Sequence, residues 1–165
     1  MKNIIYILSI LFIASCVSSS QECETKANGF IDGVEGQVTM GEQSSVEVFN
    51  QIDKAWAELD YETLKTFVAE GAEMRFYDGR VAVGPEEFVE MIKIWVSEIE
   101  DDKGNEYAWN TDYAFSLAVT SIDGDWVNAQ FTSTHTNPES KLEAEVIYEF
   151  YHIVDGKIQE WSQFK

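Results

Sequence analysis

Apolar residues recur three or four positions apart in three segments of the N-terminal part of the chain. Residues 44–59 combine this spacing with a Ser-x-x-Glu capping box, which predicts a helix. Asp60 suits the N-cap of a second, short helix, and Gly71 suits its C-terminal end. A third helix is predicted over 84–99, because Pro85 stands in its first turn and an apolar face continues along it.

The spacing changes to alternation in the C-terminal part, which predicts long antiparallel strands. The alternating runs cover 113–119, 127–135, 142–150 and, after the turn sequence VDGKI at 154–158, a last strand. A short hairpin is predicted ahead of the third helix, where Asp78 and Gly79 separate two apolar runs.

The turn after the first long strand predicts which residues of the sheet are buried. If 122–124 is a three-residue loop with Gly124 in the left-handed conformation, odd-numbered residues of the first two strands pair and share one face. The alternation then assigns even-numbered residues of 142–150 to the core. In the last strand the spacing leaves open whether Trp161 or the pair Ile158 and Phe164 points inward.

This order of elements, with its turn at 78–79, its Gly-Pro-Glu helix start at 84–86 and its final DGKI hairpin, resembles the SnoaL-like branch of the nuclear-transport-factor-like superfamily over 44–165. The resemblance implies an α+β cone, in which a curved, mainly antiparallel sheet wraps around three N-terminal helices. A pocket is implied between the first helix, the third helix and the concave sheet face. Members include polyketide cyclases, ketosteroid isomerases, dehydratases and pocket-bearing domains without a known reaction.

The first fifteen residues have the pattern of an export signal. A lysine precedes an apolar stretch over 4–14, which is shorter than the roughly 20 residues of a membrane-spanning helix. The sequence Ile-Ala-Ser-Cys ending at Cys16 resembles the bacterial lipobox, which implies a signal peptide over 1–15 and a lipid anchor on Cys16; the alternative is ordinary secretion. Val17 stands where many inner-membrane lipoproteins carry aspartate, which favours the outer membrane. Residues 16–43 show no sustained period and predict a flexible tether.

Composition narrows the classes of partner. The chain carries 30 acidic residues against 11 Lys and Arg, a net charge of −19, so nucleic acid is not an expected partner. No Cys-x-x-Cys, His-x-x-x-His or glycine-rich phosphate loop occurs, so neither a metal nor a nucleotide cofactor is expected. If Cys16 is acylated, Cys23 has no intrachain disulfide partner.

His135 and Asp78 are the candidate catalytic residues, although no motif assigns a role to either. His135 closes an apolar strand face and histidine titrates near neutral pH, but a partly exposed histidine beside the following Asn-Pro turn fits the sequence better. The hairpin turn already accounts for Asp78. Other side chains could serve an isomerase, and no spacing selects a pair among them: Asp53, Glu143, Glu145, Tyr77 and Tyr113.

Aromatic residues offer a second route to function, as walls of an apolar ligand cavity or as a solid core. The candidate ligand-binding residues are Trp56, Tyr77, Trp95, Trp109, Phe131 and Trp161. The sequence favours a lipid-anchored envelope protein that binds a small, largely apolar molecule or an envelope partner protein, with an enzyme of the cyclase, isomerase or dehydratase type as the alternative. The expected outer face is polar and predicts a monomer or weak dimer; its residues are Gln130, Thr132, Thr134, Glu143 and Glu145.

Overall fold

The computed structural model describes residues 26–100, 107–135 and 144–165. Its helices are α2 Gln43–Ala57, α3 Tyr61–Thr66 and α4 Gly84–Glu100. Its strands are β1 Val38–Met40, β2 Val68–Arg75, β3 Val81–Val83, β4 Tyr107–Val119, β5 Asp125–His135, β6 Val146–Val154 and β7 Lys157–Phe164. The three helices, the short hairpin and the four long strands expected from the sequence are therefore present.

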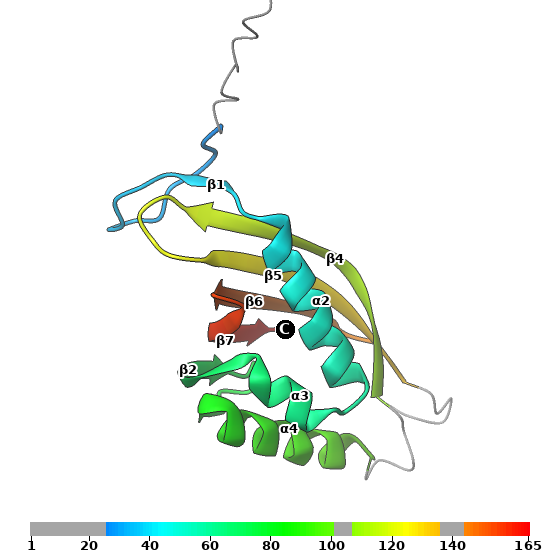
Figure 1. The fold of residues 1–165 in the computed structure, drawn as a ribbon. Helices are drawn as coiled ribbons and strands as arrows, with labels where there is room; N and C mark the ends of the chain where they lie inside the picture. The colour runs from blue at the N-terminus through cyan, green and yellow to red at the C-terminus, as the bar shows by residue number, and fades with distance from the viewer. Residues whose placement is uncertain (1–25, 101–106, 136–143) are drawn as a thin grey trace, which may run out of the picture.

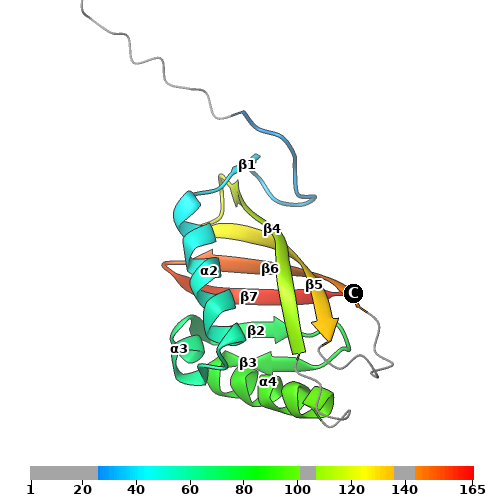
Figure 2. The same ribbon diagram turned by 90° about the vertical axis from the view of Figure 1, so that its right-hand side faces the viewer.

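The strands form one curved sheet in the order β1-β4-β5-β6-β7-β2-β3. Neighbouring strands run antiparallel, except that β2 lies parallel to β7. Figure 1 shows α2 crossing the concave face of this sheet, with α3 and α4 packed at the end formed by β2 and β3. The same crossing is visible from the side in Figure 2. This arrangement confirms the α+β cone with a mainly antiparallel sheet.

The C-terminal end of the expected tether belongs to the sheet. Strand β1 pairs with the end of β4, with Val38 opposite Val119 and Met40 opposite Leu117. A strand of three residues is too short to produce a recognisable alternation in the sequence. The expected lipobox with Cys16, and also Cys23, lie outside the described residues, and no helix within the described residues is long and apolar enough to cross a membrane.

The N-terminus of α2 is capped from another part of the chain, so the expected capping box at its start was wrong. The N-cap residue, Glu42, makes no side-chain cap bond. Instead Asp125 of β5, which is 6% exposed, accepts hydrogen bonds from the Glu42 backbone N–H at 2.9 Å and from the Ser45 hydroxyl at 2.5 Å. A carboxylate at this place complements the positive end of the helix dipole.

The short helix α3 confirms one predicted boundary and corrects the other. The Asp60 side chain accepts a hydrogen bond from the Thr63 backbone N–H at 3.1 Å, as an N-cap should. The helix then ends at Thr66, and Gly71 lies inside β2. The parallel pairing of Val68 with Ile158 in β7 draws the chain into the sheet several residues earlier than expected.

The register of β4 and β5 differs from the prediction near their turn. Gly124 does adopt the left-handed φ of 79°, but Leu117 pairs with Trp126, so odd-numbered residues meet even-numbered ones there. A bulge at Asp112 shifts the register, and odd residues pair with odd ones only beyond it. Tyr113 and Phe115 consequently lie exposed on the outer face, and the expected single apolar face was wrong.

Strand β6 also presents the opposite face to the core. Its odd-numbered residues from Ile147 to Ile153 are buried, whereas its even-numbered residues from Val146 to Phe150 are exposed. Both sets are mostly apolar, so alternation alone could not choose between them. The inward set includes Glu149, which lies between two apolar neighbours of the same face.

Strand β7 settles the alternative that its spacing left open. Ile158 and Trp161 are both fully buried, because a register shift between them turns both side chains inward, and Phe164 is exposed. Trp161 forms the centre of the aromatic core. Its ring packs against those of Trp56 at 5.8 Å and Phe76 at 5.0 Å between centroids.

Candidate functional site

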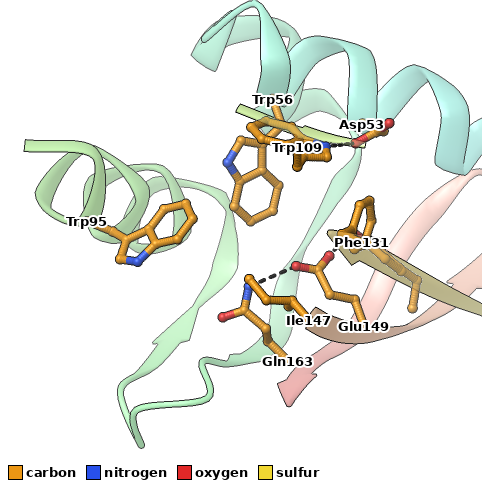
Figure 3. Close-up of a pocket in the computed structure, with 9 residues that line it drawn as sticks. Asp53, Trp56, Trp95, Trp109, Phe131, Ile147, Glu149 and Gln163 are labelled. Carbon is orange, nitrogen blue, oxygen red and sulfur yellow. Dashed lines mark hydrogen bonds between the residues drawn. The ribbon is translucent and has the colours of Figure 1, made fainter. Parts of the chain in front are cut away.

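A cleft lies between α2, α4 and the concave face of the sheet (Figure 3). Its empty space measures about 330 Å³ with the open mouth included, of which about 20 Å³ is a cavity proper, roughly the room of one water molecule. The lining residues are Asp53, Trp56, Trp95, Trp109, Phe131, Ile147, Glu149, Tyr151 and Gln163. Most of these nine are aromatic, two are carboxylates, and none carries a positive charge.

Glu149 of β6 forms the sheet side of the cleft and is only 6% exposed. Its Oε2 accepts hydrogen bonds from the Tyr151 hydroxyl and, at 3.1 Å, from the Trp161 indole N–H. Its Oε1 accepts one from the Gln163 amide at 2.8 Å. Three donors therefore fix the orientation of one buried carboxyl group.

Burial raises the pKa of Glu149 above the ordinary value of 4.5. The hydrogen bonds from its three donors oppose this rise, and the nearby charge of Asp53 adds to it. Burial also raises the pKa of Tyr151 well above its ordinary value, and the charge of Glu149 acts in the same direction. Tyr151 therefore stays a neutral donor, while Glu149 can exchange a proton nearer to neutral pH than an exposed glutamate.

Asp53 supplies a second carboxylate from the helix side. Its Oδ1 accepts a hydrogen bond from the Trp109 indole N–H at 2.8 Å, and its Oδ2 accepts one from the Thr111 hydroxyl at 2.9 Å. These bonds connect α2 to β4 at the mouth of the cleft. Figure 3 shows Asp53 and Glu149 on opposite sides of the same space.

Three indoles form much of the remaining wall. Figure 3 shows Trp95 on α4, Trp56 on α2 and Trp109 on β4 arranged around the space above Glu149. Trp56 is held in place by an edge contact with Phe88, at 5.4 Å between ring centroids, and by Trp161 below it. These contacts hold Trp56 in place, and the wall is apolar apart from the indole N–H groups.

A second hollow lies on the outer face, between residues 28–31 and the strands β4 to β7; its cavity measures about 550 Å³, against about 20 Å³ for the cavity proper of the cleft. It is mainly apolar, and the Trp126 and His152 rings stack there at 4.2 Å between centroids. Its described lining holds no buried carboxyl group, unlike the lining of the cleft between α2, α4 and the sheet, where Glu149 is buried. Among the described residues no group of three or more His, Cys, Asp or Glu side chains is placed to hold a metal ion.

No protein-family model matches the chain, and no curated protein matches its sequence. Solved structures do. A ketosteroid isomerase candidate from Kribbella flavida DSM 17836 matches with a TM-score of 0.56 at 10% identity, over 74% of this chain and 77% of that one. An LEH-like epoxide hydrolase from M. tuberculosis matches with 0.53 at 11%, over 73% and 80%. A polyketide cyclase candidate from Xanthomonas campestris pv. campestris matches with 0.53 at 14%, over 74% and 90%.

The chain has the nuclear-transport-factor-like cone fold. The fold implied by the SnoaL-like resemblance is thereby confirmed. At these identities the matches establish the fold alone, because one fold can host different reactions. The cleft described above occupies the interior of the cone, where the resemblance implied a pocket.

The cone brings four of the six candidate ligand-binding residues to one cleft: Trp56, Trp95, Trp109 and Phe131. Trp161 lies beneath the cleft, fully buried, and reaches it through its bond to Glu149. Tyr77 lies elsewhere, in the β2–β3 hairpin loop, where the Lys165 ammonium stands 5.1 Å from its ring centroid. Whether any of these residues binds a ligand stays a prediction.

Of the two catalytic candidates, Asp78 lies away from the groups that the cleft brings together. Asp78 accepts hydrogen bonds from the Arg80 backbone N–H at 3.0 Å and from its Nε at 2.6 Å, and the Arg80 side chain lowers the pKa of Asp78. It serves the hairpin loop. His135 is the last residue of β5 and pairs with Tyr107, and its side chain lies outside the described residues.

The remaining acid–base candidates are scattered through the cone. Asp53 reaches the cleft, whereas Tyr113 lies on the outer face. Glu145 forms an ion pair with Lys165 at 2.5 Å, and Glu143 lies outside the described residues. Of the five, only Asp53 is brought to the cleft among the described side chains.

Sequence reasoning missed Glu149, Tyr151 and Gln163. All three occupy inward positions of β6 and β7. The available signal was the run from Ile147 to Ile153, whose odd-numbered residues are as apolar as the even-numbered ones except for one glutamate. A lone carboxylate in an otherwise apolar alternating set indicates a buried functional group once the face is known.

Proposed function

We propose that the cleft takes up a small, largely apolar molecule and that Glu149 exchanges a proton with it, as in an enzyme of the isomerase, cyclase or hydrolase kind. The observation that carries this proposal is the buried Glu149 carboxyl, oriented by three donors at the wall of an aromatic cleft. A general acid or base works best when its pKa lies near the working pH. The raised pKa of Glu149 moves it in that direction.

The two carboxylates take different parts in this proposal. Burial favours the neutral form of Glu149 and its donors favour the charged form, so both forms are accessible to a catalytic cycle. Asp53, held by Trp109 and Thr111, orients a donor group of the substrate at the mouth. Because the cavity proper has room for about one water molecule, the substrate enters by displacing water and by rotation of side chains at the mouth.

The test is a turnover assay with small ketones, enols and epoxides in heavy water, followed by NMR for deuterium incorporation and for ring opening. Replacement of Glu149 by Gln keeps the shape of the side chain and removes the proton carrier. We expect a loss on the order of 10²- to 10⁴-fold in rate for at least one compound that the native protein turns over. The matched control is Asp112→Asn, on the outer face, which should leave that rate unchanged.

Two outcomes would contradict the proposed role of Glu149. Compounds that raise the melting temperature of the native protein and of Glu149→Gln equally, without turnover, would make the cleft a binding site only. Turnover that survives Glu149→Gln but disappears in His135→Gln would move the chemistry to the end of β5.

We also propose that this domain is held in the bacterial cell envelope, at the outer membrane, by acyl chains on Cys16. The support is the apolar stretch over 4–14 and the lipobox-like sequence that ends at Cys16. In cells, Cys16→Ser should abolish lipid labelling and move the protein out of the detergent-extracted membrane fraction. Mature native protein in the aqueous phase with an unmodified N-terminal residue would contradict the anchor.

A further inference from the structure

Three hydrogen-bond donors of the cleft are already bonded to its two carboxylates. The donors of Trp109, Tyr151 and Gln163 are turned onto the two carboxylates, as their hydrogen bonds show. Figure 3 shows the carbonyl oxygen of Gln163 pointing away from Glu149, on the side of Trp95. The lining therefore holds carboxylate oxygens, an amide oxygen and aromatic rings, together with the uncharged indole N–H groups of Trp56 and Trp95.

We propose that the ligand of this cleft is an organic cation, a small amine or quaternary ammonium compound with an apolar body. The proposal rests on the proposed function only in that the cleft takes up a small molecule. None of the nine described lining residues is Lys, Arg or His, so nothing among them repels a cation and nothing neutralises an anion. Asp53 contributes negative charge at the mouth, and Glu149 adds to it in its ionised form.

The aromatic wall suits the same ligand. Trp56, Trp95, Trp109 and Phe131 contribute rings from α2, α4, β4 and β5. A cation over an aromatic face gains about 2 kcal/mol or more where water is excluded, and tryptophan is the best of the rings. Trp56, Trp95 and Phe131 are all buried, so the contact would form in a largely dry setting. An uncharged ligand of the same shape would lose this attraction.

The net charge of the whole protein also favours a cationic ligand. The net charge is −19, with 30 acidic residues against 11 Lys and Arg. Such a surface raises the local concentration of cations and speeds their arrival at a cleft. This attraction is unspecific and weakens with salt, so the test must separate it from recognition inside the cleft.

The experiment compares three probes of nearly the same shape by calorimetry at about 150 mM salt. They are choline, its uncharged carbon isostere 3,3-dimethylbutan-1-ol, and the anion 3,3-dimethylbutanoate. We expect choline to bind at least tenfold more tightly than the isostere and the anion not to bind. The preference should fall at least tenfold in Asp53→Asn and in Trp95→Leu, and should persist in Asp112→Asn, whose substituted side chain lies on the outer face.

Trp95→Leu leaves the net charge unchanged. A choline preference that persists in this variant would therefore reflect unspecific charge attraction and would overturn the proposal. Equal binding of choline and the isostere would also overturn it, while leaving the proposed uptake of an apolar molecule intact. Failure of all three probes to bind the folded protein would count against it as well. A clear choline preference combined with no proton transfer in the turnover assay would keep the cation site and refute the enzyme. Circular dichroism of each variant checks that it is folded.

Discussion

The concave and convex faces of the strands β4 to β7 are both rich in aromatic side chains, yet only one of them is a core. On the concave face Trp161 and Tyr151 are buried beneath α2 and donate to a single carboxyl group. On the convex face Tyr148 and Phe150 are exposed. The difference shows that apolar content does not decide which side of a strand is buried. The amphipathic helices decide it, because they cover one face only.

The largest expected effect comes from deleting one phenylalanine on each face. Phe131 is 5% exposed on the concave face and packs against Phe49 at 6.0 Å between centroids, whereas Phe150 is 40% exposed on the convex face. Phe131→Ala should lower the free energy of unfolding by about 3–5 kcal/mol. Phe150→Ala should lower it by about 1 kcal/mol, because less apolar area is lost. Urea unfolding of both variants checks this, and equal losses would refute the assignment of the faces.

A smaller contrast concerns two aspartates of the same pair of strands, Asp125 at the start of β5 and Asp112 in the middle of β4. Asp125 is buried and caps α2 through the Glu42 N–H and the Ser45 hydroxyl. Asp125→Ala should lower the free energy of unfolding by about 1–3 kcal/mol, since it leaves those donors without an acceptor. Asp112 accepts bonds from Gln130 and Thr132 in water. Asp112→Ala should therefore leave the midpoint of urea unfolding almost unchanged; a comparable shift would show that Asp125 is no special cap.

The third prediction concerns the pH dependence of stability. The pKa of Glu149 is raised in the folded protein, so the folded state binds this proton more tightly than the unfolded state does. The extra stability that this bound proton gives the folded state is fully present below pH 4.5, the ordinary pKa of glutamate. It is lost as the pH rises through the raised pKa of Glu149 in the folded protein. Glu149→Gln carries no such proton. Its free energy of unfolding relative to the native protein should therefore increase with pH above about 4.5.

This difference is measured by urea unfolding of both proteins from about pH 4 to about pH 8. The control is Glu58→Gln at the C-cap of α2, where the side chain is exposed. Its difference from the native protein should not show the trend of Glu149→Gln. A Glu149→Gln difference that is flat with pH, or that falls as the pH rises, would contradict the raised pKa.

Sequence reasoning predicted the parts of the cone that depend on residues close together in the sequence. The spacing within α4, the N-cap at Asp60 and the hairpin before α4 follow from neighbouring residues. The face of β6 could not follow from them, because Tyr148 and Tyr151 belong to two equally apolar sets. Only the position of α2 over the sheet, set by contacts far apart in the sequence, distinguishes them.

The candidate site was half predicted for the same reason. Trp56, Trp95 and Trp109 could be predicted because large aromatic side chains were expected to form either the core or the walls of a cavity. Glu149 was not predicted, because the apolar alternation of 142–150 assigned the even-numbered residues of that strand to the core, whereas the odd-numbered ones are buried. The bulge at Asp112 shifts the register of β4, and no turn residue in the sequence marks its position.

The convex face bears on the expectation of a monomer or weak dimer. That expectation assumed a polar outer face; Gln130 and Thr132 do lie there beside Asp112, but the face also carries exposed aromatic side chains. Five aromatic residues there are 40–51% exposed: Tyr113, Phe115, Tyr148, Phe150 and Phe164. If each leaves on the order of 80 Å² uncovered, the patch is about 400 Å². This is roughly half of what one partner buries in a standard interface, so association should be weak.

The smallest expected effect is therefore on self-association through this face. We expect the native protein to form a reversible dimer only at tens of micromolar and above, and Phe150→Lys to stay monomeric there, because a buried unpaired lysine is costly at the centre of an interface. Gln51→Lys on α2 adds the same charge on the helix side and should associate like the native protein. Sedimentation velocity over a range of concentrations separates the cases. If Gln51→Lys also stays monomeric, charge alone governs association and the convex face plays no part.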